Sequence, residues 1–133
     1  MLREFIQQLC TELEIGIPKL NEKKVFPFKL TNDVEVALKD LEPGVGLQAQ
    51  ICPCPKMKRE EIFIYLMRAN LLGQGTGGSR IGMDPDEKFL TLSLGLPYEM
   101  NYKMFKESFE DFVNYLIYWR DIVAKFEKDE SVY

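Results

Sequence analysis

The feature that most constrains this sequence is an apolar stripe in its last third. Seven large apolar side chains follow one another at alternating intervals of four and three residues: Phe105, Phe109, Phe112, Leu116, Trp119, Val123 and Phe126. This spacing keeps them on one face of an α-helix, and Asn101 can cap the start of that helix. A coiled coil is the alternative interpretation, but aromatic residues outnumber the Leu and Ile that a coiled coil prefers. We therefore predict a long helix that packs on a sheet.

Three earlier segments alternate apolar and polar residues, which is the pattern of strands with one buried face. The alternation covers residues 26–30, 34–38 and 45–51. Short stretches of turn-forming residues separate the three segments, so we predict an antiparallel meander. Pro27 has no amide hydrogen to donate to a neighbouring strand, which predicts that the first strand lies at an edge of the sheet.

Two further helices are predicted on either side of the meander. The first is amphipathic and covers Leu2–Leu13, with Gly16 as its stop signal. The second covers Lys58–Leu72, because this stretch has neither glycine nor proline and is followed by Gly73; a buried strand is the alternative. Its run Ile62–Met67 has no polar break. A helix that is apolar on every side must be covered on every side, so one face can lie on the sheet while the other needs a partner subunit.

A glycine-rich stretch follows the second predicted helix. Gly73-x-Gly75-x-x-Gly78 has the letters of a dinucleotide fingerprint, but it follows a helix and precedes a strand, which is the reverse of the required order. Gly78-Ser79-Arg80 also lacks the lysine of a Walker loop. We interpret the stretch as a connection to a β-hairpin over residues 81–96. A nucleotide-binding enzyme that uses the Gly73–Gly78 loop is the alternative hypothesis.

Composition excludes several classes of function. The 133 residues carry a net charge of −4 with both signs mixed, which does not suit a nucleic-acid partner. Histidine is absent, so the commonest general base is missing and we predict no catalytic residue and no cofactor. Cys10, Cys52 and Cys54 are odd in number and lack the spacing of zinc or redox motifs, which predicts no metal site and a reducing compartment. No apolar run approaches the ~20 residues of a membrane span.

The sequence resembles the class I type III secretion chaperones of the Tir chaperone (CesT-like) family. The resemblance covers nearly the whole chain and is most specific between Leu66 and Arg120. The matching segments are Leu66–Leu71, Thr76-Gly77-Gly78, Ile81–Asp84, Phe89–Leu92 and Tyr118-Trp119-Arg120. The expected fold is α+β, in the order helix, three strands, helix, two strands, helix, with the helices packed on a twisted antiparallel sheet in a dimer. One domain is expected over residues 1–128, followed by a short charged tail at 129–133.

The resemblance implies a protein of the bacterial cytoplasm that binds the chaperone-binding segment of a type III secreted effector. It would keep this virulence effector soluble and secretion-competent without nucleotide. A homodimer is implied, and a heterodimer with a related chaperone that serves a secretion gatekeeper protein is the alternative. The expected dimer contacts are Ile62, Phe63, Leu66, Met67, Asn70, Ile81 and Met83. The candidate effector contacts are Phe5, Leu9, Leu13, Phe26, Phe28, Val34, Val36, Leu47 and Ala49.

A core position is the alternative for each of these effector candidates, because the sequence does not show which face of the sheet the last helix covers. On the effector hypothesis, Phe28→Asp is predicted to abolish effector binding and to leave the fold intact.

Overall fold

The computed structural model describes residues 2–20, 25–56, 58–71 and 78–128. Its elements are α1 (Leu2–Leu13), β1 (Phe26–Lys29), β2 (Glu35–Asp40), β3 (Val45–Pro53), α2 (Arg59–Asn70), β4 (Arg80–Met83), β5 (Phe89–Leu96) and α3 (Tyr102–Glu127). This is the predicted order of helices and strands. Residues 72–77, which include most of the predicted glycine loop, and the predicted tail at 129–133 lie outside the described residues.

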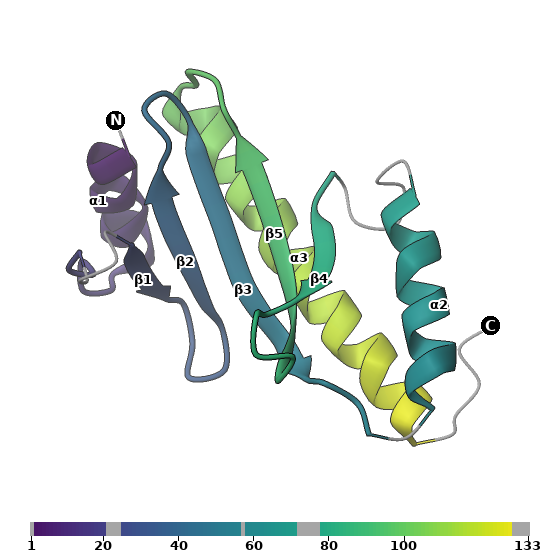
Figure 1. The fold of residues 1–133 in the computed structure, drawn as a ribbon. Helices are drawn as coiled ribbons and strands as arrows, with labels where there is room; N and C mark the ends of the chain where they lie inside the picture. Colours follow the sequence, from purple (N-terminus) through teal and green to yellow (C-terminus); the bar gives the residue numbers. More distant parts are fainter. Residues whose placement is uncertain (1, 21–24, 57, 72–77, 129–133) are drawn as a thin grey trace.

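The strands form one antiparallel sheet with the order β1-β2-β3-β5-β4 (Figure 1). The first three strands make the predicted meander, and β1 lies at one edge, as Pro27 indicated. The β4–β5 hairpin adds two strands beside β3, so that β4 forms the other edge. β3 is longer than predicted, because it resumes pairing with β5 at Cys52 and Pro53 after a register shift.

The long helix α3 covers one face of the sheet, behind the strands in Figure 1. All seven apolar residues of the predicted stripe are buried within the chain itself, so the packing on the sheet is confirmed and the stripe is not left for a coiled coil. Phe28 of β1 meets Phe109 edge to face, with ring centroids 5.1 Å apart. The helix begins at the predicted cap, where Asn101 Oδ1 accepts a hydrogen bond from the Met104 amide at 2.9 Å.

The first helix packs against the N-terminal part of α3. Phe5 stacks on Phe105 with centroids 5.2 Å apart, and Lys106 forms a 2.8 Å ion pair with Glu12. α1 ends before the predicted stop at Gly16, because Glu14 adopts a left-handed conformation with φ of 56°. The amides of Glu14 and Ile15 then bond back to carbonyls of the last turn, which is the Schellman arrangement. None of the described helices combines the length and the hydropathy that crossing a membrane would require.

Arg120 joins α3 to the irregular part of β3. The register between β3 and β5 shifts between Gln50 and Cys52, and such a bulge leaves backbone groups without a partner strand. Arg120 Nε donates to the Ile51 carbonyl at 2.9 Å, and Nη2 donates to the Gln50 carbonyl at 2.8 Å. Nη1 donates to the carbonyl of Asp33 in the turn before β2. One planar guanidinium therefore bonds three carbonyls that come from two segments.

We expect Arg120→Met to lower the free energy of unfolding by about 2 kcal/mol, because hydrogen bonds to a charged group contribute more than neutral ones. Part of the loss is offset where water replaces the guanidinium at the exposed carbonyls. Urea unfolding followed by circular dichroism measures the change. Lys125→Met is the matched control, since it removes only an exposed pair with Asp121 and should change stability by less than about 0.5 kcal/mol. Equal losses in the two variants would contradict this role for Arg120.

Candidate protein-interaction site

Helix α2 is covered by its own chain on one side. Ile62 and Leu66 face inward and are buried. Tyr65 contacts two rings of α3, at centroid distances of 5.9 Å from Trp119 and 5.0 Å from Phe126. The helix predicted over residues 58–72 is thus confirmed, and α2 lies beyond the β4 edge of the sheet (Figure 1).

The outward side of α2 carries an apolar stripe that the chain leaves open. Ile64 is 47% exposed, Met67 is 71% exposed and Leu71, which follows the helix, is 66% exposed. The three residues are spaced by three and four and therefore share one face of the helix. Large apolar side chains gathered on one exposed face are typical of protein-interaction sites.

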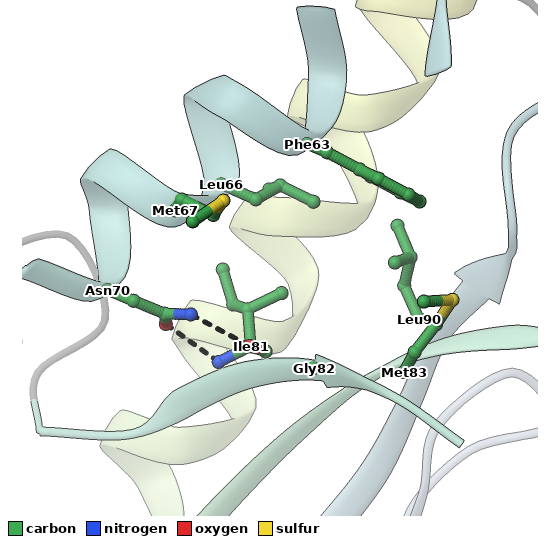
Figure 2. A pocket seen from close by; sticks show the side chains of 8 residues that line it. All are labelled: Phe63, Leu66, Met67, Asn70, Ile81, Gly82, Met83 and Leu90. Carbon is green, nitrogen blue, oxygen red and sulfur yellow. Dashed lines mark hydrogen bonds between the residues drawn. The ribbon is translucent and has the colours of Figure 1, made fainter. Parts of the chain in front are cut away.

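A cavity of about 180 Å³ lies between α2 and the β4–β5 hairpin (Figure 2). Its apolar wall includes Phe63, Leu66, Met67, Ile81, Met83 and Leu90. Figure 2 shows these side chains converging from the helix above and the strands below. We call this cavity, together with the exposed stripe of Ile64, Met67 and Leu71, the α2–β4 surface. Its chemistry suits an apolar side chain of another protein.

Asn70 fixes the position of α2 relative to β4. Its Nδ2 donates to the Ile81 carbonyl at 2.7 Å, and its Oδ1 accepts from the Ile81 amide at 2.8 Å, as the dashed lines in Figure 2 show. β4 is an edge strand, and an edge presents unpaired backbone groups to any incoming strand. The side chain of Asn70 occupies these groups of Ile81, so at this residue the edge is closed to another strand.

The structure brings most of the predicted dimer residues together. Phe63, Leu66, Met67, Asn70, Ile81 and Met83 all line the one cavity. Ile62 lies on the inner side of α2 and is fully buried. Ile64 and Leu71 are not among the predicted dimer residues, although their spacing from Met67 marked one helix face. Every position from 62 to 67 is apolar, which conceals the difference between the inner and the outer side.

The candidate effector residues lie mostly in the core. The buried ones are Leu9, Phe26, Phe28, Val34, Val36, Leu47 and Ala49. They are buried because α3 covers the apolar face of the sheet and α1 packs against α3, which is the point that the sequence left open. Phe5 is partly buried and Leu13 is 42% exposed, so these two retain accessible surface. Contact with an effector stays a prediction for all nine residues.

The three cysteines are all free, and burial is the main cause of the shifts in the pKa values of their thiols. Burial raises the pKa of Cys52 to about 11, with a smaller contribution from the Glu127 carboxylate. Burial also raises the pKa values of Cys10 and Cys54. A thiol with a raised pKa stays protonated near neutral pH and is a poor nucleophile and metal ligand. In the described part of the chain, no cluster of three or more metal-binding side chains occurs.

The model of the Tir chaperone protein (CesT) family matches residues 4–120 of this chain. The chain belongs to the Tir chaperone protein (CesT) family. The resemblance found in the sequence is thereby confirmed, and the α2–β4 surface lies within the CesT-family part of the chain. Among curated proteins, none matches the sequence.

Several solved structures share this CesT-family fold. A chain of the ExsC–ExsE complex superposes with a TM-score of 0.73 and 13% identity, over 90% of this chain and 91% of that one. A chain of the HopA1–SchA chaperone–effector complex superposes with a TM-score of 0.67 and 11% identity, over 90% of this chain and 93% of that one. A chain of the heterodimeric ExoU–SpcU complex from the type III secretion system of Pseudomonas aeruginosa superposes with a TM-score of 0.62 and 11% identity, over 96% of both chains. The CesT family is thus a family of chaperones, and the HopA1–SchA complex is a chaperone–effector complex.

Proposed function

We propose that this protein is a bacterial cytoplasmic chaperone that binds the chaperone-binding segment of a type III secreted effector. It keeps the effector soluble and secretion-competent without nucleotide. Membership of the CesT family over residues 4–120 carries the proposal. The likeness to a chaperone–effector complex and to a complex from a type III secretion system supports it.

Binding rather than catalysis suits the chemistry of the chain. Histidine is absent from the sequence, and the raised pKa of Cys52 keeps that thiol protonated at neutral pH. Exposed apolar residues, in contrast, are spaced along the end of α1 and the segment after it, at Leu13, Ile17 and Leu20. An effector segment that covers them gains about 25 cal/mol for each Å² of apolar surface removed from water.

Two copies of the chain form the functional unit, with the α2–β4 surface between them. The exposed stripe of Ile64, Met67 and Leu71 supports this, because it is a helix face that the chain itself does not cover. A heterodimer with a related chaperone is the alternative. Light scattering on the purified chain distinguishes the two, since a monomer would indicate a missing partner.

The test is affinity capture of the effector from the bacterium that encodes the chain, in buffer without nucleotide. We expect the tagged protein to retain a type III secreted protein. Deletion of the gene that encodes the chain should reduce secretion of this retained protein. Leu13→Asp should weaken capture about tenfold, because removing one buried leucine contact costs more than 1.4 kcal/mol. Ile117→Asp, at a 51% exposed site on α3, is the control and should leave capture unchanged.

Capture that needs ATP, or no effect of the deletion on secretion of any retained protein, would contradict the proposed function. Equal losses from Leu13→Asp and Ile117→Asp would instead contradict the assignment of Leu13 to the effector-binding surface.

A further inference from the structure

The face of the sheet opposite α3, which is turned toward the viewer in Figure 1, is hollowed over its central strand β3. Two cavities of about 610 Å³ and about 140 Å³ lie there, and Ala37 of β2 and Gln48 of β3 line both of them. The strand register places Gln48 between Ala37 and Ser93 of β5. Because these two neighbours are small, the backbone of another chain has room beside Gln48. We call the two cavities together the open-face trough.

Gln48 and Gln50 present two side-chain amides to the open-face trough. Both residues are exposed, and a spacing of two along a strand places them on the same face of the sheet. Among the described residues, neither side-chain amide has a hydrogen-bond partner, and Arg120 fixes the backbone at Gln50 through its carbonyl at 2.8 Å. The two amides are about 6.8 Å apart along β3, which is also the two-residue repeat of any extended peptide.

Asn70 shows within this chain what such an amide does beside an extended backbone. Its Nδ2 donates to the Ile81 carbonyl at 2.7 Å, and its Oδ1 accepts from the Ile81 amide at 2.8 Å. One side-chain amide therefore satisfies both backbone groups of one residue in a strand. Glutamine carries the same donor and acceptor on a longer side chain. Gln48 and Gln50 are spaced to bond alternate residues of an extended segment in the same way.

The charges of β2 are complementary to a segment of one direction. Glu35 and Lys39 are exposed, and they lie two residues before and two residues after Ala37 on the same face of the strand. Neither forms an ion pair with a described residue, although Lys29 lies opposite Glu35 in the register of β1 and β2. A segment that carries a basic side chain near Glu35 and an acidic one near Lys39 is attracted at both ends, and the reversed segment is repelled.

We propose that the open-face trough binds an extended polar segment of the effector through its main chain. Gln48 and Gln50 bond backbone groups of alternate residues, and Glu35 and Lys39 pair with side chains of opposite charge. The inference rests on the proposed function and adds a polar binding surface to the exposed apolar residues at the end of α1. Main-chain groups are common to all peptides, so they supply affinity without selecting a sequence. The trough therefore lets one chaperone accept effectors that differ in sequence.

Removal of the two amides tests the trough, with the effector that the wild type retains in affinity capture as the probe. The double variant Gln48→Ala/Gln50→Ala should raise the dissociation constant of that effector at least about tenfold by calorimetry, because several main-chain hydrogen bonds are lost. Asn114→Ala removes an exposed amide of α3 and is the matched control, which should bind like the wild type. In nuclear magnetic resonance spectra, the side-chain amide signals of Gln48 and Gln50 should shift when the effector is added, and that of Asn114 should not.

Charge reversal tests the direction of the segment. Glu35→Lys and Lys39→Glu should each raise the dissociation constant about threefold at low salt and less at high salt, because the paired charges are screened. Equal affinities of both variants and the wild type at low salt would overturn the charge pairing.

Three results would overturn the trough as an effector site. The first is a double variant, folded by circular dichroism, that binds the effector as tightly as the wild type. The second is a set of glutamine amide signals that do not move. The third is a double variant that loses self-association in light scattering and keeps effector binding, which would assign the trough to a second copy of the chain. All three leave the chaperone function standing, whereas a wild type that retains no secreted protein overturns the function and the inference together.

Discussion

Phe28→Asp is expected to unfold the protein. The Phe28 side chain has no solvent exposure, and its ring packs edge to face on Phe109 of α3. Removing a buried phenylalanine alone costs about 3–5 kcal/mol, and burying a carboxylate without a partner adds several more. A domain of this size has a total stability of about 5–15 kcal/mol. The substitution therefore consumes most or all of the free energy of unfolding.

Circular dichroism and urea unfolding measure this effect, with Lys29→Asp as the control. Lys29 is the next residue of β1 and points to the open face of the sheet, so the same new carboxylate faces water there. We expect the control to change stability by less than about 0.5 kcal/mol. A cooperative unfolding transition for Phe28→Asp close to that of Lys29→Asp would contradict a core position for Phe28.

This result replaces the expectation that the same substitution leaves the fold intact. The alternation of residues 26–30 correctly indicated a strand with one apolar face. It could not indicate what covers that face, because periodicity within a strand is the same whether a helix of the same chain or an effector lies on it. The decisive contact joins Phe28 to Phe109, far apart in sequence.

Elements whose causes are local were predictable from the sequence. The seven-residue stripe, the cap at Asn101 and the edge position required by Pro27 each depend on a few neighbouring residues, and the structure confirms all three. Features with distant causes were not predictable. The partners of Arg120 lie 69 to 87 residues away, and no local pattern marks an arginine that will bond a β-bulge. Glu14 ends α1 in a conformation that glycine usually adopts, so Gly16 gave a misleading signal.

The candidate site lies between these two cases. The sequence indicated that α2 has more apolar surface than one sheet can cover, and six of the seven predicted dimer residues do line one cavity. It could not separate the inner from the outer side, since residues 62 to 67 are apolar throughout. Only the packing of Ile62 and Leu66 against the rest of the chain leaves Ile64 and Leu71 as the open face.

Ile64→Asp is expected to convert the dimer into a folded monomer. In the proposed homodimer Ile64 lies in the exposed stripe between the two copies, so this substitution removes an apolar contact and places a carboxylate in an apolar interface. The dimer dissociation constant should rise at least about a hundredfold, since the two effects together exceed 2.8 kcal/mol. The free energy of unfolding of the monomer should fall by only about 1 kcal/mol, because nearly half of the side chain, 47%, is already exposed.

Ile117→Asp is the matched control for Ile64→Asp. Ile117 is also an isoleucine within a helix, it is 51% exposed, and it lies on α3 and not among the residues that line the cavity. Light scattering over a concentration series measures the dissociation constant of each variant, and urea unfolding measures its stability. If exposed apolar area alone drove self-association, both variants would dissociate alike. Because the proposed interface is a defined face of α2, Ile64→Asp should be monomeric where Ile117→Asp remains dimeric, and the reverse result would remove α2 from the interface.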